Sequence, residues 1–159
     1  MNRPLLEETV RTEWVDYNGH MNDAEYARVF SIAVDQLMNV LGIDASFRSK
    51  NHYSIYTLET HLCYLAEAHK DQTLHVSAQL LNHDDKRLHV FFIMENSDGE
   101  KLATSEQMLM GMDMEAGRPA PFPSPVSSRV QEFAKESGKS PYPDQAGRKI
   151  GIKKKKSSR

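Results

Sequence analysis

The chain has 159 residues, of which 39% are hydrophobic and 26% charged, so one domain can bury a core without disulfide bonds or structural metals. Its single cysteine, Cys63, excludes an intramolecular disulfide and an all-cysteine metal site, and favours a reducing, cytoplasmic location. No run approaches the roughly 18 apolar residues of a membrane span, and residues 1–10 have no apolar core of a signal peptide. We therefore expect no membrane partner.

The net charge of −2 is unevenly distributed along the chain. Residues 1–118 contain 10 Lys and Arg against 19 Asp and Glu, whereas residues 119–159 contain 10 against 3. We therefore predict an acidic domain over residues 1–118, followed by a basic C-terminal extension over residues 119–159. An acidic domain disfavours nucleic acid as a partner, because phosphate binding needs a basic surface.

The first elements are a strand, a sharp turn and a long helix. Alternation from Leu5 to Val15 predicts the strand, and Asp16-Tyr17-Asn18-Gly19 predicts the turn. Asn22 is placed to cap the helix, with Glu25 reaching back to the Asn22 N–H in a capping box. Gly42 is placed to end it in a left-handed conformation. Apolar residues recur between them at three- and four-residue spacing: Tyr26, Phe30, Ala33, Val34, Leu37, Met38 and Leu41.

Residues 44–50 are polar and predict a loop, after which the apolar period changes from helical spacing to two. Four strands are expected, at residues 53–66, 73–81, 88–94 and 101–113. Their short connections predict a meander of antiparallel neighbours. One buried helix and such strands hide both apolar surfaces when the sheet curls around the helix, so we predict an α+β fold with an antiparallel sheet wrapped around one long central helix.

The outer face of this sheet is also expected to be apolar. Depending on register, it carries Leu62, Tyr64, Phe91 and Ile93 or the opposite set. A sheet with two apolar faces needs a second cover, so we expect a homodimer that continues the sheet or a homotetramer packed face to face. From Arg118 alternating prolines predict an extended spacer, and Ser124-Pro125 starts a short helix that ends near Gly138.

The run Val15-Asp16-Tyr17-Asn18-Gly19-His20-Met21-Asn22, followed by Tyr26 and Phe30, resembles the signature of the 4-hydroxybenzoyl-CoA thioesterase family of hotdog-fold acyl-CoA thioesterases. The resemblance covers about residues 5–115. Within the family, this form of the motif is most similar to thioesterases associated with carnitine and betaine metabolism. It implies a hotdog fold, an acyl-CoA substrate and no further cofactor.

The same resemblance places Asp16 at the catalytic carboxylate and the backbone N–H groups of Asn22 to Ala24 at the oxyanion site. The chemistry is consistent, because a carboxylate can activate water or attack a thioester directly. Unpaired N–H donors at a helix N-terminus stabilise the negative charge that develops on the carbonyl oxygen. We include Asn18 and His20 among the candidate catalytic residues.

Each of these residues has a simpler interpretation. Asp16 and Asn18 are typical turn formers, and Asn22 is typical of a helix cap. His20 either orients the turn or contacts substrate, and Glu59 and His61 face either the site or solvent. The remaining histidines have no paired ligand spacing, so we predict no metal. They are His52, His69, His75, His83 and His89.

The acyl group is expected to bind among residues next to the turn. The candidate substrate-binding residues are Trp14, Tyr17, Asn22, Asp23, Tyr26 and Phe30, and Tyr53 and Tyr56 begin the next strand. Aromatic rings that converge in an acidic domain favour a cationic acyl group. Together with the resemblance to carnitine-associated thioesterases, they indicate a trimethylammonium acyl-CoA such as betainyl-CoA. The alternative is that the rings are core and the substrate carries a neutral short or medium chain.

The basic extension is either a solvated tail or a site for CoA phosphates. The second interpretation assigns the phosphates to Arg148, Lys149 and the cluster Lys153 to Lys156, across a subunit boundary if necessary. Two other functions on the same fold stay open at this point: a noncatalytic acyl-CoA-binding module and an enoyl-CoA hydratase.

Overall fold

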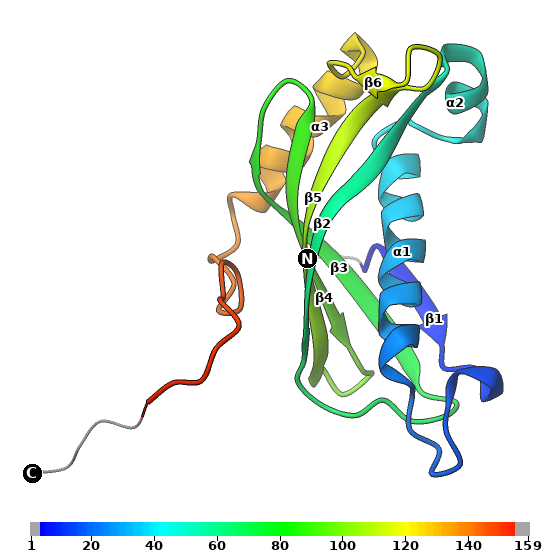
Figure 1. The fold of residues 1–159 in the computed structure, drawn as a ribbon, viewed down its shortest axis with the longest axis vertical. Coiled ribbons are helices and arrows are strands. Elements are labelled where there is room, and N and C mark those ends of the chain that lie inside the picture. Colours follow the sequence, from blue (N-terminus) through cyan, green and yellow to red (C-terminus); the bar gives the residue numbers. More distant parts are fainter. Residues whose placement is uncertain (1–3, 155–159) are drawn as a thin grey trace, which may run out of the picture.

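A curved antiparallel sheet wraps around one long helix in the computed structural model, which describes residues 4–154 (Figure 1). The helical elements are η1 (Thr12–Trp14), α1 (Asp23–Val40), α2 (Ala45–Asn51) and α3 (Ser124–Ser137). The strands are β1 (Leu6–Thr9), β2 (Tyr53–Tyr64), β3 (Thr73–His83), β4 (Arg87–Glu95), β5 (Lys101–Asp113) and β6 (Arg118–Pro119). The predicted α+β arrangement is confirmed. No helix within these residues is long and apolar enough to cross a membrane.

The strands lie in the order β1-β3-β4-β5-β2, and neighbouring strands are antiparallel. The meander was predicted correctly for β3, β4 and β5, but it was wrong for β2, which pairs with β5. The connection between β2 and β3, residues 65–72, therefore runs from β2 at one edge of the sheet to β3, the strand next to the opposite edge. The N–H groups of its first two residues, Leu65 and Ala66, both donate to Leu102 O. These backbone donors therefore keep hydrogen-bond partners where the chain leaves the sheet.

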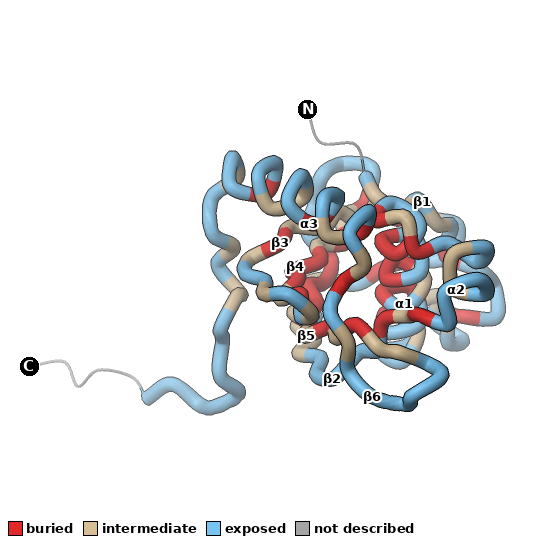
Figure 2. Tube along the Cα trace, turned by 90° about the horizontal axis from the view of Figure 1, so that it is seen from above, coloured by how far each residue is buried: buried red, intermediate tan, exposed pale blue. Residues whose placement is uncertain are grey.

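The helix α1 is buried along one face, as its apolar spacing predicted. Its buried residues are Tyr26, Val29, Phe30, Ala33, Val34, Leu37 and Met38. Viewed from above, the buried positions gather where α1 faces the sheet (Figure 2). Gly42 has a φ of +86°, so the predicted left-handed residue after the helix is confirmed.

The first strand is shorter than predicted, because its partner ends. Thr9 lies opposite Thr73, the first residue of β3, and the Val10 N–H makes one further bond to Gln72 O at 2.9 Å. Beyond this point no ladder is available, and the chain turns into η1. The Trp14 N–H donates to Arg11 O, and the indole is only 3% exposed.

The predicted loop at residues 44–50 was also wrong, since α2 forms there. The Asp44 side chain accepts the Phe47 N–H at 2.8 Å, which caps the helix. The Phe47 ring lies edge-on to the ring of Tyr53, with centroids 6.5 Å apart. A capped short helix with one aromatic anchor therefore replaces the irregular segment.

The predicted C-terminal helix is confirmed as α3, and it covers the edge of β3 that β1 leaves open. Ser137 Oγ accepts the Leu80 N–H of β3 at 2.8 Å, and Val126 and Val130 belong to the same hydrophobic core as α1. An open edge of this kind otherwise exposes unpaired donors and acceptors. The division of the chain at residue 118 stays a prediction, but α3 packs as part of the folded body.

The two faces of the sheet are divided differently from either predicted set. Leu62 lies opposite Ser105, whereas Phe91 lies opposite Glu106. Consecutive residues of a strand point to opposite faces, so Leu62 and Tyr64 lie on one face and Phe91 on the other. The first of these is the face towards α1, because Leu62 and Ser105 share a cavity with α1 residues. This places Tyr64 beside the N-terminus of α1.

Candidate active site

The predicted entry turn is a short hairpin that is attached to the connection between β2 and β3. Val15 and Met21 form an antiparallel bridge, and between them Gly19 has a φ of +79°, which glycine adopts without steric cost. His20 forms a second bridge with His69 of the connection. Two segments far apart in the sequence are thereby fixed to each other.

Asp16 lies at the base of this hairpin with one carboxylate oxygen engaged by the backbone. Its Oδ1 accepts the Asn18 N–H at 2.9 Å and the His20 N–H at 3.1 Å. Its Oδ2 has no hydrogen-bond partner within residues 4–154, and the residue is exposed and lines a cavity. One oxygen therefore stabilises the turn, and the other is available for chemistry.

The N-terminus of α1 lies beside this carboxylate, but the predicted capping box is absent. The Asn22 side chain makes no cap hydrogen bond, and its N–H donates to Trp14 O at 2.9 Å. The Glu25 carboxylate instead pairs with Arg28 at 2.6 Å. The long-range bond to Trp14 takes the donor that Glu25 would have reached, which explains the failure of the local rule.

This arrangement narrows the donors available at the helix N-terminus. Of the three N–H groups expected there, that of Asn22 is used by Trp14, and that of Ala24 donates to Asp23 Oδ1 at 2.9 Å. The N–H of Asp23 has no protein partner in the described part of the chain. It is therefore the backbone donor that a ligand can take without displacing another group.

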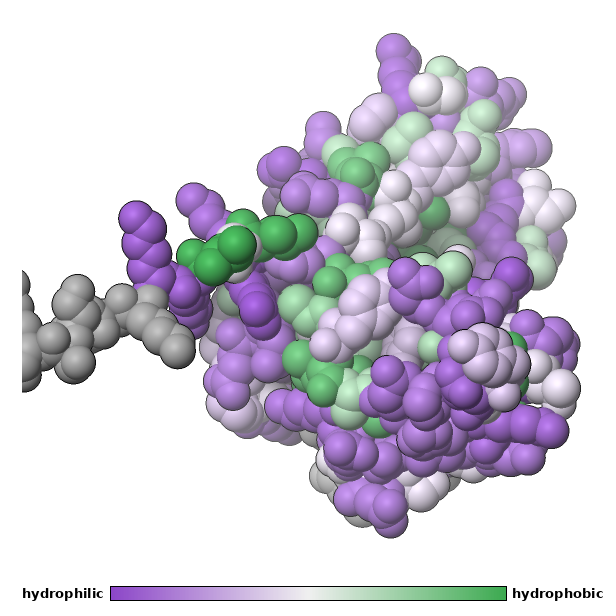
Figure 3. All heavy atoms as spheres, turned by 60° about the horizontal axis from the view of Figure 1, so that its bottom comes forward, coloured by the Kyte–Doolittle hydropathy of each residue, from purple (hydrophilic) through white to green (hydrophobic). Residues whose placement is uncertain are grey.

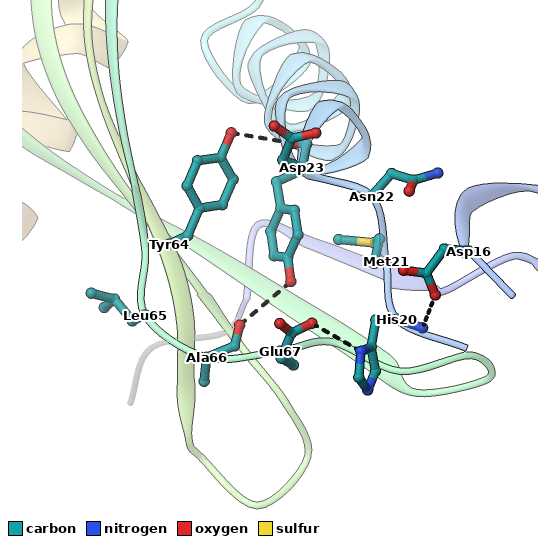
Figure 4. A pocket seen from close by; sticks show the side chains of 10 residues that line it. Asp16, His20, Met21, Asn22, Asp23, Tyr64, Leu65, Ala66 and Glu67 are labelled. Atoms are coloured by element: carbon teal, nitrogen blue, oxygen red, sulfur yellow. Dashed lines mark hydrogen bonds and ion pairs between the residues drawn. The ribbon is translucent and has the colours of Figure 1, made fainter. Parts of the chain in front are cut away.

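A cavity of about 510 Å³ opens between the hairpin, the first turn of α1 and the end of β2. It is lined by Asp16, His20, Met21, Asn22, Asp23, Tyr26, Tyr64, Leu65, Ala66 and Glu67. Asp16 and Tyr64 stand on opposite sides, with Glu67 and His20 between them (Figure 4). Figure 3, turned towards this end of the molecule, shows apolar side chains in a hollow between hydrophilic ones.

Two tyrosine rings form one corner of the cavity. The rings of Tyr26 and Tyr64 lie 5.2 Å apart between centroids at an interplanar angle of 86°. The Tyr26 hydroxyl accepts the Ala68 N–H at 3.1 Å and donates to Ala66 O at 3.4 Å. The Tyr64 hydroxyl donates to Asp23 O at 3.3 Å. Burial raises the pKa of both phenols, so both stay protonated as donors at neutral pH.

Three carboxylates and one imidazole supply the charge around the cavity. Asp16, Asp23 and Glu67 line it, and no Lys or Arg in the described part of the chain does. His20 Nδ1 lies 3.6 Å from Glu67 Oε2, which forms an ion pair only when the imidazole is protonated. The cavity is therefore electronegative apart from the backbone donors of α1.

Several predicted site residues lie elsewhere. Tyr17 is 97% exposed and Asn18 is exposed, and neither lines the cavity. Trp14 is buried under Arg11, whose guanidinium carbon lies 4.7 Å from the ring centroid. The role of Asn18 here is the backbone contact to Asp16 described above. Trp14 and Tyr17 therefore do not converge on this cavity with Tyr26.

Tyr53, Tyr56, Glu59 and His61 do not line this cavity either. His61 and Glu59 lie opposite Glu106 and Met108 of β5, on the face away from α1. For these two side chains, the interpretation that placed them outside the site agrees with the register.

Phe30 lines a second cavity, of about 490 Å³, between the middle of α1 and strands β2 and β5. Gln107 also lines it and is 5% exposed; its Oε1 has no hydrogen-bond partner among residues 4–154, while its Nε2 donates to Ser105 Oγ at 2.9 Å. Because Phe30 is one helical turn from Tyr26, the two cavities follow one another along the groove between α1 and β2.

The basic C-terminal segment lies on the other face of the sheet. The Gly147 N–H donates to Glu106 Oε1 at 2.7 Å, and Glu106 points away from the face that carries Ser105 and Gln107. Arg148 and Lys149 therefore do not reach the cavity of the same copy, and Figure 1 shows this segment leaving on the far side of the sheet from α1. Lys155 and Lys156 lie outside the described residues.

Tyr64, Glu67 and His69 were not predicted from the sequence as site residues. Their proximity to Asp16 and His20 depends on β2 pairing with β5 and on the connection that follows β2. The one sequence signal for Tyr64 was that it alternates onto the same face of its strand as Leu62. The sequence did not determine which face of the sheet that was, because the register of the strand was unknown. Among residues 4–154, no group of three or more His, Cys, Asp or Glu side chains is arranged to hold a metal ion.

Comparison with known proteins gives a consistent set of relatives. Residues 10–130 match the model of a family described as the thioesterase-like superfamily. A betainyl-CoA thioesterase from Pseudomonas aeruginosa is 43% identical over 147 residues, which cover 92% of each chain. An L-carnitine dehydrogenase/betainyl-CoA thioesterase from Rhizobium meliloti is 39% identical over 151 residues, 94% of this chain but 30% of that relative's length.

Solved structures also agree with this chain over nearly its whole length. A hypothetical protein from Staphylococcus aureus, solved in complex with CoA, superimposes with a TM-score of 0.90 and 31% sequence identity. The alignment covers 96% of this chain and 98% of that one. The hotdog fold expected from the motif is confirmed by this match.

Proposed function

This chain belongs to the thioesterase-like superfamily, and we propose that it hydrolyses betainyl-CoA to betaine and CoA, with Asp16 as the catalytic carboxylate. It is a thioester hydrolase, and the choice of acyl group and the roles of the residues are the proposal. Within the superfamily, the motif around Asp16 supports placing the chain near the 4-hydroxybenzoyl-CoA thioesterase family.

The observation that carries the proposal is the position of the free Asp16 oxygen. Asp16, whose Oδ2 is not used by the turn, lines the same cavity as Asp23, whose backbone N–H has no protein partner in the described part of the chain. A thioester carbonyl placed between them meets a base or nucleophile on one side and a donor on the other. Groups of the first kind contribute about 10²- to 10⁴-fold in rate, and one oxyanion donor about 10²- to 10³-fold.

The reaction adds water across the thioester bond. The Asp16 carboxylate either takes a proton from water as it attacks the carbonyl carbon, or attacks that carbon itself and is released by water in a second step. In both cases the C–S bond breaks and the CoA thiolate leaves. Among the described histidines, His20 is the one that lines the cavity, and its imidazole can return a proton to the departing sulfur.

A second copy of the chain is part of the proposal. The strand β2 is at the edge of the sheet, with Tyr56 and Leu58 exposed by 45% and 54%. A long edge strand with exposed apolar side chains supports a homodimer that continues the sheet, and a homotetramer when two such dimers pack. In either assembly, a partner's basic segment is available to CoA phosphates.

The deciding experiment is steady-state hydrolysis of a panel of acyl-CoA substrates, measured as release of free thiol. We expect betainyl-CoA to have the highest kcat/KM, with betaine and CoA formed in equal amounts. Thermal stabilisation by acyl-CoA without thiol release would instead identify a noncatalytic binding module. Loss of enoyl-CoA absorbance without thiol would identify a hydratase. The cytoplasmic location inferred from the single cysteine also stays a prediction.

A further inference from the structure

The geometry of a betainyl thioester restricts where its cation can bind. The quaternary nitrogen is two single bonds from the carbonyl carbon, a distance of about 2.5 Å. Any group that recognises this nitrogen must therefore border the cavity that holds Asp16 and the N-terminus of α1. Of the aromatic residues named as candidates from the sequence, only Tyr26 borders that cavity. Among the described residues, Tyr64 supplies the other phenol ring that borders it.

The two tyrosines form a rigid corner of the kind that binds quaternary ammonium groups. Their rings are nearly perpendicular, at 86° and 5.2 Å between centroids. Hydrogen bonds from both hydroxyls to the backbone, to Ala66 O and Asp23 O, hold the rings without a ligand. A cation within about 6 Å of such a ring is attracted to its face, and little order has to be created on binding. Tyr64 is 51% exposed, so its face is open to a ligand.

Charge on the cavity wall favours the same ligand. The N-terminus of α1 is a positive dipole end and disfavours a cation by itself. Glu67 enters from the β2–β3 connection and, with Asp16 and Asp23, offsets this dipole with negative charge (Figure 4). Because no Lys or Arg of residues 4–154 lines the cavity, an anionic acyl group finds no counter-charge there from these residues except a protonated His20.

We infer that Tyr64 and Glu67 determine substrate specificity, with Tyr64 and Tyr26 binding the trimethylammonium group and Glu67 neutralising it. This inference rests on the proposed function, since it concerns the acyl group of that substrate. It replaces the aromatic set expected from the sequence, in which Trp14 and Tyr17 were to serve this role. The choice of acyl group therefore depends on residues at the end of β2 and in the connection after it, and not only on residues of the turn.

The test compares betainyl-CoA with its neutral isostere, 3,3-dimethylbutanoyl-CoA, in which carbon replaces the quaternary nitrogen. The ammonium group also activates the carbonyl chemically, so each enzymatic ratio is divided by the ratio of the uncatalysed hydroxide rates. After this correction, we expect wild-type kcat/KM to be about 10-fold or more higher for betainyl-CoA, as two aromatic faces allow. Equal corrected values, or a preference for the isostere, would overturn the inference.

Substitutions then assign the discrimination to residues. Tyr64→Leu should lower the corrected ratio about 3- to 30-fold by removing one aromatic face, and Tyr64→Phe should retain most of it. Glu67→Gln should lower it about 2- to 5-fold, and less at high salt, because Glu67 is partly solvated. The matched controls are Tyr142→Leu and Glu115→Gln, which change exposed residues away from the cavity. They should leave the ratio at its wild-type value.

The outcomes separate this inference from the proposed function. Thiol release from both substrates with no discrimination, or a Tyr64→Leu variant with the wild-type ratio, overturns the cation site and leaves the thioesterase intact. Equal losses in Tyr64→Phe and Tyr64→Leu would also overturn it, since the hydroxyl rather than the ring would then be responsible. Absence of thiol release from either substrate, with release from another acyl-CoA, overturns the choice of betainyl-CoA itself.

Discussion

Replacing Asp16 by Asn tests the central chemical assignment with the smallest change in shape. The amide retains an oxygen that can accept the Asn18 and His20 N–H groups at 2.9 and 3.1 Å, so the hairpin keeps its local hydrogen bonds. Only the negative charge and the basic oxygen are lost. These two bonds are weakened rather than broken in an exposed turn, so the free energy of unfolding should fall by about 1 kcal/mol or less.

The expected effect on activity is much larger. A positioned base or nucleophile contributes about 10²- to 10⁴-fold, which corresponds to about 3 to 5 kcal/mol of transition-state stabilisation. We therefore expect kcat for thiol release to fall by that factor, while the melting temperature falls by only about 2 to 4 °C. The measurement is steady-state thiol release from betainyl-CoA and butyryl-CoA, with thermal unfolding of the same samples.

Asp84→Asn is the matched control, because Asp84 has the same local role in another turn. Its Oδ1 accepts the Lys86 and Arg87 N–H groups at 3.0 and 2.7 Å, in the β3–β4 hairpin and outside the cavity. This variant should keep near-wild-type kcat. A folded Asp16→Asn protein with near-wild-type kcat would refute the catalytic role and leave Asp16 as a turn former. Similar losses of activity in Asp16→Asn and Asp84→Asn would indicate that the loss comes from a weakened turn and not from a missing catalytic carboxylate.

The remaining predictions concern stability, pH and the C-terminal segment. Ser137→Ala leaves the buried Leu80 N–H without its acceptor and should lower the free energy of unfolding by about 1 to 3 kcal/mol in urea, whereas Ser128→Ala, on the same helix but exposed, should change it little. The Arg87 side chain donates to Asp84 and lowers the pKa of that carboxyl to about 2. The stabilisation is therefore present above about pH 4 and is lost as the pH falls towards 2, so the stabilities of wild type and Asp84→Asn should converge over that range; a constant difference would contradict the assignment. Deleting residues 148–159 should raise KM for acyl-CoA at low salt with kcat unchanged, and an unchanged KM there would remove the CoA role of the segment.

Local patterns in the sequence predicted those elements whose causes are themselves local. The spacing of apolar residues from Tyr26 to Leu41 and the position of Gly42 are sufficient to define α1 and its end, because helix periodicity and a left-handed terminal residue act within a few residues. Period-two alternation defined the strands for the same reason. The turn at Asp16 was predictable because its acceptor and donors lie within four residues of one another.

Predictions failed where a distant partner replaced a local one. The capping box at Asn22 is absent because its N–H donates to Trp14, and the first strand stops at Thr9 because β3 starts at Thr73. Neither fact is visible from the residues around Asn22 or Thr9. Local propensity yields to such contacts because a hydrogen bond to either partner satisfies the same backbone group.

The positions of Tyr64 and Glu67 in the cavity could not be predicted from local sequence patterns, because they depend on the tertiary structure. Alternation assigned Tyr64 and Leu62 to a common face, but only the pairing of β2 with β5 determines which face that is. Glu67 reaches the cavity because the connection after β2 crosses the end of α1 and pairs with the hairpin at His20 and His69. The sequence by itself therefore identified the turn that carries Asp16 and the helix behind it. Strand order determined what faces them, because strand pairing is set by burial of whole faces rather than by residues near in sequence.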